Sequence, residues 1–380
     1  MSSTTSSSSS ASVSSGGAAA PQSTLPVLAV RRSEVTYPTG NKSFSVMQAF
    51  PAAISAEEAD PFLMCDFFGP TKSTGVESDP DRFPVAWHPH RGMDIATYMV
   101  QGVGRHADSM GNRETFESPG MQFCSVGSGI EHAEGGGTPA GADMAGFQIW
   151  VNVPSARKMD APRYGTIGPA ELPLLAFDGN VSVRPLAGEL GGRAGPFSTV
   201  QPLLMADVTL PPGQAVTLPV RADFETAIAF VFRGGARVNG AAAGRNEVVL
   251  LDGSDAAGGR GLELAAAGPD GASVMVFCGK RLNQPIAWHG PFVLTTQAEV
   301  RATIQEYQRG AFPPVRAPFD YKTLAAFPAD HAARRASKLT AELAATLSVK
   351  ELKQALAARG VALAGMSEKA ELVAALLAAE

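Results

Sequence analysis

Histidine is scarce in this chain, and it is concentrated where it could bind a metal ion. The 380 residues contain 6 histidines, and three of these lie between His88 and His106. In "AWHPHRG" a single proline separates His88 from His90, and "EHAE" places His132 and Glu134 at the same i, i+2 spacing. Residues i and i+2 of a β-strand point to one face. The two pairs therefore predict three imidazoles and one carboxylate directed at one ion.

These ligand types limit the chemistry that the site could support. Imidazole and carboxylate without thiolate suit Fe, Mn, Ni, Cu or Zn and argue against an iron–sulfur cluster. A six-coordinate ion with four protein ligands keeps two positions for substrate, O2 or water. A single His-x-His pair often arises by chance, so it is the second pair that favours a metal site. His106 is expected beside the ligands or at the surface. Asp94, Asp108 and Glu131 are candidates for orienting the rings, although Glu131 faces away from His132.

Short strands must position these residues. The chain has 40 glycines, 28 prolines and 45% hydrophobic residues, a composition typical of strands joined by tight turns. "TYMVQGVGRHADSM" reads as strand, turn and strand, and "AGFQIWVNVP" alternates before it ends at a proline. Similar segments recur from about 175 to 285. The pattern predicts an all-β fold of antiparallel sandwich or barrel type.

Helices are expected only towards the C-terminus. Over 295–310, Thr296 and Glu299 fit a capping box and Gly310 is a suitable residue after the helix end. Residues 347–380 read as two capped helices around a short connection. They form a small helix–loop–helix behind a linker at 316–346.

Composition and charge exclude several classes of protein. The net charge of −5 gives no positive field for nucleic acid or anionic membrane. Cys65, Cys124 and Cys278 lie far apart, which predicts buried free thiols in a reducing compartment. No apolar run is long enough to span a bilayer. The serine-rich residues 1–26 are expected to be disordered and lack a secretory signal pattern, although an organelle transit peptide stays open.

Several ordered motifs resemble the pirin family, a branch of the cupin superfamily. They are "DPFLMCDFFG", "HPHRGMDIATYMVQG", "HADSMGN", "VGSGIEHAEG", "FQIWVNVP", "KMDAPRY", "HGPFVLTTQAEV" and "IQEYQRGAF". The resemblance runs from about residue 28 to 315. It implies a bicupin, that is, two antiparallel jelly-roll-type barrels, with a metal-binding domain at 27–160 and a second cupin with a closing helix at 161–315. The chain departs from the usual "HPHRGFE" at Met93 and Asp94, neither of which is a ligand position.

The resemblance also implies a ligand set and a metal. The family's ligands fall on His88, His90, His132 and Glu134, and its usual metal is iron as Fe2+ or Fe3+, with other divalent metals compatible with the same ligands. No histidine lies between His132 and His289, so the second barrel is expected to be structural.

Two functions are associated with pirins. One is quercetin 2,3-dioxygenase-type cleavage of a flavonol- or catechol-like substrate with O2, in which Glu134 would act as general base. The alternative is a non-enzymatic, iron- and redox-responsive co-regulator that binds a transcription factor in the nucleus. Residues 347–380 resemble a SAP-like module, but their four basic and four acidic side chains cancel, so direct DNA binding is expected to be weak. A monomer in the nucleus or cytoplasm is expected.

Overall fold

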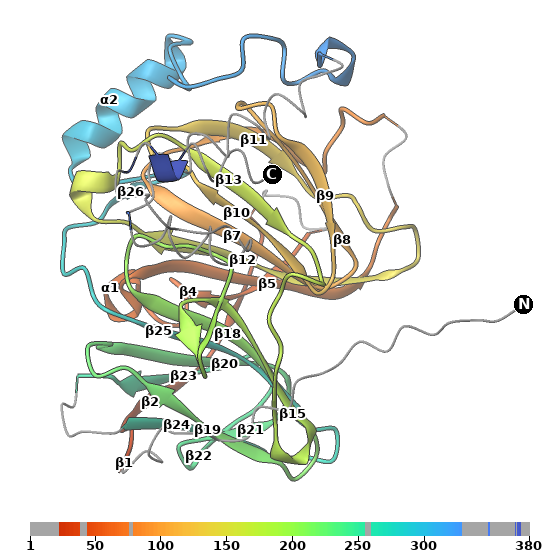
Figure 1. Ribbon diagram of the computed structural model, residues 1–380, viewed down its shortest axis with the longest axis vertical. Coiled ribbons are helices and arrows are strands. Elements are labelled where there is room, and N and C mark those ends of the chain that lie inside the picture. Colours follow the sequence, from red (N-terminus) through yellow and green to blue (C-terminus); the bar gives the residue numbers. More distant parts are fainter. Residues whose placement is uncertain are drawn as a thin grey trace, which may run out of the picture. The chain divides into compact units, whose positions relative to one another are not determined.

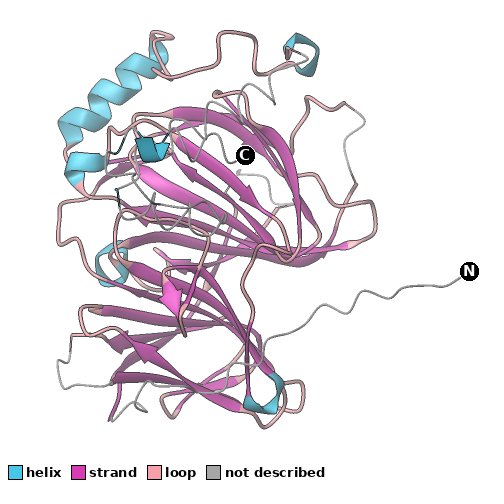
Figure 2. Cartoon of the chain, viewed as in Figure 1, coloured by secondary structure: helices cyan, strands magenta, loops and turns pink. Residues whose placement is uncertain are grey.

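The computed structural model describes residues 23–38, 44–75, 79–254 and 260–328, together with positions 349, 369 and 371–373. The chain divides into two compact units, residues 1–317 and 318–380. The larger unit consists of strands in two barrels with few helices (Figures 1 and 2). The predicted all-β fold with two antiparallel barrels is confirmed. Most of the predicted tail at 1–26 and of the helical module at 347–380 lies outside the described residues. Ser23–Thr24 already form strand β1 and Leu25 is buried, so the expected limit of the tail at residue 26 was too late.

The first barrel closes a seven-stranded sheet against a four-stranded sheet. The larger sheet has the strand order β13-β10-β7-β12-β5-β4-β3. Its strands are Arg163–Ile167, Gly120–Ser125, Met93–Gln101, Asp143–Asn152, Phe62–Lys72, Val46–Phe50 and Glu34–Thr36 in that order. The smaller sheet has the order β6-β11-β8-β9. Its strands are Val85–His90, Ile130–Glu134, Val103–Asp108 and Arg113–Glu117.

The second barrel repeats this plan. Its seven-stranded sheet has the order β14-β15-β18-β25-β20-β23-β2. These strands are Leu175–Phe177, Val181–Ala187, Leu203–Leu210, Ala272–Gly279, Thr226–Gly234, Glu247–Asp252 and Val27–Arg32. A five-stranded sheet faces it, made of β1, β24, β21, β22 and β19. Their bounds are Ser23–Thr24, Arg260–Ala266, Ala236–Val238, Ala241–Ala243 and Ala215–Val220.

Burial along the strands shows where the cores lie. In β19 exposed and buried residues alternate, as expected for a strand with one wet face. All eight residues of β25 are buried, because this strand packs into its own barrel on one side and against the first barrel on the other. Aromatic side chains from both seven-stranded sheets share this inter-barrel core, including the edge-to-face pair Phe62–Phe277 at 5.2 Å.

The ends of the larger unit are exchanged between the barrels. Strand β2, near the N-terminus, pairs with β23 of the second barrel. The hairpin of β26 (Ala287–His289) and β27 (Phe292–Leu294) packs on the first barrel, where Phe292 bridges to Arg91. The strand pairing thus differs from the domain limits expected from sequence, 27–160 and 161–315. The first barrel also takes in β13, which follows residue 160 and pairs with β10.

Two short α-helices lie in the described part of this unit. α1 (Ala56–Ala59) begins at Ser55 with a capping box to Glu58. α2 (Gln297–Gln308) begins at Thr296 with the predicted capping box to Glu299, and Gly310 follows its end with φ +69°. Single 3-10 turns lie at Ser155–Arg157, Asp178–Asn180 and, in the second unit, Leu324–Ala326. No helix in the described part of the chain is both long enough and apolar enough to cross a membrane.

Candidate metal centre

Three histidines meet inside the first barrel. His88 and His90 lie on β6, and His132 on the neighbouring β11 is directly opposite His88. One ligand nitrogen of each ring lies within 4.8 Å of the other two. His90 and His132 are buried, and His88 is half-buried. The structure therefore brings together the three imidazoles that strand parity selected.

The hydrogen bonds of these rings fit a shared cation. Nδ1 of His88 lies 2.8 Å from the carbonyl of Ala86, so it donates there and leaves Nε2 with a lone pair. Nε2 of His88 lies 2.9 Å from Nε2 of His132. Two nitrogens bound at right angles to one ion, each about 2.1 Å from it, would be about 3.0 Å apart. Nδ1 of His132 is buried without a hydrogen-bond partner in the described structure, and the buried His90 ring has no hydrogen bond of normal geometry, with only the Pro291 carbonyl near enough for a weak one.

The protonation state of the two buried rings also suits a metal. Burial, followed by repulsion from His88, lowers the pKa of His90 well below its usual value. The pKa of His132 is lowered in the same way, first by burial and then by the neighbouring histidines. Neutral imidazole is the form that binds metal ions. The residues present therefore fit a metal ion bound by nitrogen ligands.

Glu134 belongs to the same surface but not to the three-histidine cluster. Its position on β11 is opposite Val85, because a register shift separates it from the His132–His88 pair. Its Oε1 accepts a hydrogen bond of 2.8 Å from Nε2 of Gln148. Burial raises the pKa of Glu134, while His88 and His106 act in the opposite direction. Glu134 is thus within electrostatic reach of the histidines as a restrained carboxyl group.

His106 lies beside the three-histidine cluster and contacts one of its rings. It is buried, and its ring packs edge-on to His132 with centroids 5.3 Å apart and stacks on Tyr164 at 4.6 Å. Its Nε2 lies 3.1 Å from Oδ2 of Asp108. Asp108 also accepts the backbone N–H groups of Met110 and Asn112. Asp108 therefore orients His106 and a turn rather than a ring of the three-histidine cluster.

The other two expected orienting residues do not reach the rings. Asp94 lies opposite Ser125 on β10 and hydrogen-bonds to it, and burial raises its pKa to about 6. This places it on the opposite face of β7 from Ile95, which packs in the interior. Glu131 alternates with His132 along β11 and does not join the cluster. The expectation for Asp94 was wrong because strand alternation turns it outwards.

Thiol ligation is disfavoured even though one cysteine lies inside this barrel. Cys124 packs in the apolar cluster with Ile95 and Ile130. Burial raises its pKa well above the usual value, and nearby carboxylates, Asp108 first, raise it further. A protonated thiol is a poor metal ligand. All three cysteines are free and buried, as predicted.

Sequence reasoning missed the residues that face the histidines from the larger sheet. Gln148 and Trp150 alternate on β12 with Phe147 and Ile149, which pack in the inter-barrel core. Trp150 packs edge-on to His90 with centroids 5.1 Å apart. The signal was available in "FQIWVN", where a glutamine stands between two apolar residues of an alternating strand. Its meaning depended on knowing which sheet faces β11.

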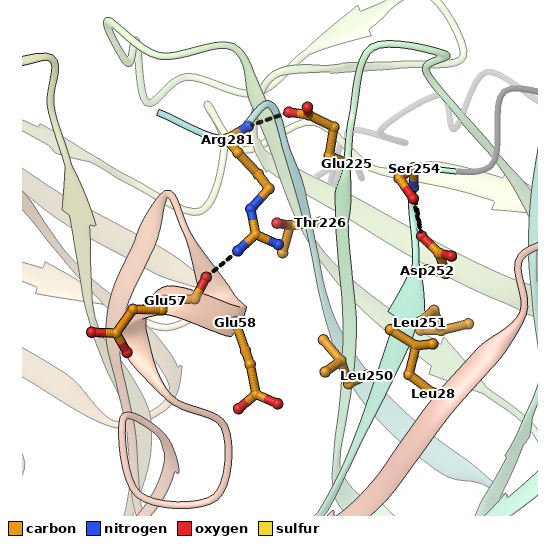
Figure 3. Close-up of a pocket in the computed structure, with 10 residues that line it drawn as sticks. All are labelled: Leu28, Glu57, Glu58, Glu225, Thr226, Leu250, Leu251, Asp252, Ser254 and Arg281. Atoms are coloured by element: carbon orange, nitrogen blue, oxygen red, sulfur yellow. Dashed lines mark hydrogen bonds between the residues drawn. The ribbon is translucent and has the colours of Figure 1, made fainter. Parts of the chain in front are cut away.

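A separate cavity of about 350 Å3 lies between α1 and strands of the second barrel (Figure 3). None of the three clustered histidines lines it. Arg281 reaches across it, donating through its guanidinium to the carbonyl of Glu57 and through its backbone N–H to Glu225 at 2.9 Å. Glu58 is paired with Arg31 at 2.7 Å. No histidine lines this cavity, so it offers no imidazole ligand for a metal ion.

Comparison with known proteins matches parts of both barrels. The Pirin family model matches residues 43–151, and the model of the Pirin C-terminal cupin domain matches residues 205–313. A pirin-like protein of Caulobacter vibrioides is 33% identical over 289 residues, covering 76% of this chain and 99% of its own length. A Pseudomonas aeruginosa protein with the provisional name quercetin 2,3-dioxygenase is 33% identical over 263 residues, covering 67% of this chain and 88% of its own.

A solved structure extends the likeness to three dimensions. The crystal structure of quercetin 2,3-dioxygenase from Acinetobacter baumannii superposes with a TM-score of 0.67 at 27% identity, covering 77% of this chain and 99% of that one. Two antiparallel barrels in one chain, with histidines gathered in the interior of one of them, define a cupin-fold protein of the two-barrel type. This chain belongs to the pirin family.

Proposed function

We propose that this pirin is an iron-dependent dioxygenase that uses O2 to cleave a flavonol- or catechol-like substrate, as a quercetin 2,3-dioxygenase does. The observation that carries the proposal is the convergence of three imidazoles inside a barrel, two of which, those of His90 and His132, are buried. Likeness to a solved quercetin 2,3-dioxygenase along almost its whole length supports the substrate class.

His88, His90 and His132 would hold the ion, with Glu134 as a fourth ligand on the same strand surface. When bound, such an ion supplies Lewis-acid polarisation of a substrate oxygen and a redox partner for O2. Iron is proposed from the family; the nitrogen and carboxylate ligands suit it but would also accept other first-row metals. The chain contributes a rigid array, because each histidine projects from a paired strand.

Glu134 is placed to take the proton of a substrate hydroxyl. Burial raises its pKa, so its conjugate acid is more stable in this interior than in water. The hydrogen bond from Gln148 engages Oε1, so Oε2 is the oxygen left to bind the ion or to accept the proton. The same carboxylate could thus bind as a ligand and accept a proton during turnover.

Apolar side chains around the histidines favour a flat organic ligand and exclude water. Leu63, Met93, Ile95 and Ile130 pack together in the interior of the first barrel, with Trp150 and Trp288 against them. The two indole rings lie 5.8 Å apart. Exclusion of water strengthens the electrostatic interactions of the site.

The test is oxygen uptake by iron-loaded protein incubated anaerobically with quercetin and then exposed to air. We expect uptake in the wild type and none above background in His88→Ala. Oxygen uptake that does not exceed the His88→Ala control would remove this activity.

The alternative of a transcriptional co-regulator depended on residues 347–380, which lie almost entirely outside the described structure. It therefore stays a prediction, as do the nuclear location and the monomeric state.

A further inference from the structure

A row of polar residues crosses the interior face of the larger sheet in the first barrel. Its members are directly opposite one another on five adjacent strands, β10, β7, β12, β5 and β4: Gln122, Thr97, Gln148, Asp66 and Gln48. Their neighbours along the strands, among them Tyr98, Phe147 and Phe67, pack in the inter-barrel core on the opposite face. The polar row therefore faces the histidine-bearing sheet.

The middle of this row is hydrogen-bonded to the candidate centre. Oγ1 of Thr97 donates to Oε1 of Gln148 at 2.6 Å, and Nε2 of Gln148 donates to Oε1 of Glu134 at 2.8 Å. These two contacts define the orientation of the amide. If it were reversed, its oxygen would lie against a carboxylate oxygen, and two acceptors would repel each other.

Glu134 needs such a partner because the pairing of β11 with β6 does not by itself direct its carboxylate to the histidines. The register shift between His132 and Glu134 moves the carboxylate away from the pairing that holds the imidazoles together. Within the described part of the chain, no donor other than Gln148 contacts the carboxylate of Glu134. With Oε1 held from the facing sheet, Oε2 is the oxygen that can turn to the histidines.

We propose that Gln148, oriented by Thr97, is a positioning residue that directs Oε2 of Glu134 to the metal and thereby sets metal affinity. This inference rests on the metal centre of the proposed function. Partners that hydrogen-bond to a ligating carboxylate typically change metal affinity by about 10–100-fold. Thr97 and Gln148 lie on the sheet opposite the ligands, so the metal site requires both sheets of the barrel.

The test measures Fe2+ affinity anaerobically by competition with a chromogenic chelator, for Gln148→Met, Glu134→Gln and the double variant. Gln148→Met should bind Fe2+ about 10–100-fold more weakly than the wild type. The double variant should bind no more weakly than Glu134→Gln alone, because the amide acts only through the carboxylate. Thr97→Val should give a smaller loss. Gln101→Met, an exposed glutamine at the end of β7, is the matched control and should bind like the wild type.

A second readout separates positioning from a general loss of structure. The visible spectrum of the Co2+-loaded protein reports the ligand set, so Gln148→Met should shift it towards the spectrum of Glu134→Gln. Metal-free unfolding midpoints show whether each variant is folded. Wild-type affinity in Gln148→Met, or a loss that adds fully to that of Glu134→Gln, would overturn the inference. Failure of oxygen uptake with quercetin would overturn only the proposed activity, because the comparison of metal affinities among the single and double variants requires no turnover.

Discussion

At the scale of single residues, hydrogen-bond partners separate histidines of similar position into different roles. His106 and His132 are both buried on neighbouring strands, and their rings touch. Nε2 of His106 is occupied by Asp108, whereas Nε2 of His132 faces His88. His106 therefore packs against the cluster and is held by Asp108, whereas His132 has a nitrogen available to a metal ion.

This difference predicts that two alanine substitutions reduce iron binding to very different extents. His132→Ala should abolish stoichiometric iron binding, because one of three converging nitrogens is lost. His106→Ala should retain iron with a modest loss of affinity, since it removes only a packing partner of His132. Metal analysis of the two purified variants is the measurement. Equal loss of metal in both would assign His106 to the ligands.

Asp66 gives a prediction about pH that is independent of the metal ligands. The residue is 4% exposed, its carboxylate accepts from Gln48 at 2.7 Å, and burial raises its pKa from 3.8 to about 6. A raised carboxyl pKa stabilises the fold below the unfolded-state value and loses that contribution as pH rises to the folded-state value. As the pH rises from 4 to 6, ionisation of Asp66 should therefore progressively lower the free energy of unfolding. The loss is complete at pH 7, where it amounts to at most about 3 kcal/mol.

Asp66→Asn keeps the acceptor for Gln48 and removes the charge. We expect urea unfolding to show this variant more stable than the wild type at pH 7, with the difference vanishing near pH 4. Identical pH dependence in the two proteins would show that Asp66 does not titrate in this range.

At the scale of elements, sequence patterns predicted local features well and cross-strand features poorly. Strand alternation was enough to select His88, His90 and His132, and the capping box at Thr296 gave the start of α2. The register shift before Glu134 and the partnership with Gln148 depend on strands distant in sequence. No single-strand pattern contains that information, because it arises only when the two sheets close on each other.

Arg91 shows how one element fastens another. This buried residue directly follows His90, and its guanidinium donates to the carbonyl of Ser128 at 2.7 Å, to Thr303 at 2.8 Å and to Glu306 at 2.7 Å. It thereby ties helix α2 to the strand that carries two of the clustered histidines.

We expect Arg91→Met to lower the free energy of unfolding by about 2–4 kcal/mol, because several charge-assisted hydrogen bonds are lost in a buried site. Glu306→Gln should cost less than about 1 kcal/mol, since its side chain is 36% exposed. Urea unfolding of both variants measures this difference, and hydrogen exchange should rise in α2 only for Arg91→Met. If both variants lost a similar free energy of unfolding, the stabilisation by Arg91 would come from its ion pair with Glu306 alone.

At the scale of the whole molecule, the two barrels form one compact unit with a shared core. Their seven-stranded sheets share an aromatic core, and Tyr98 of the first donates to Asp207 of the second at 2.7 Å. Asp207 is buried, and burial raises its pKa. Two barrels were predictable from strand spacing and family resemblance. The seam, that is, the contact between the two seven-stranded sheets, was not predictable, because the sequence shows its residues only as apolar positions of strands.

Tyr98→Phe tests the seam. Removal of the hydroxyl leaves a buried carboxylate oxygen without its donor, so we expect a loss of about 1–3 kcal/mol. Because the core is shared, calorimetry should still show one unfolding transition. Two resolved transitions in the wild type would mean that the barrels are energetically separate.

The exchanged ends of the larger unit have a consequence for synthesis on the ribosome. Val27 is translated early but must wait for Leu251, its partner in β23. The first barrel, although its sheets are complete by Ile167, receives its covering hairpin only when Phe292 has emerged. Both barrels of the nascent polypeptide therefore stay incomplete until β25 has emerged, and a stall before Gly279 would leave neither barrel finished.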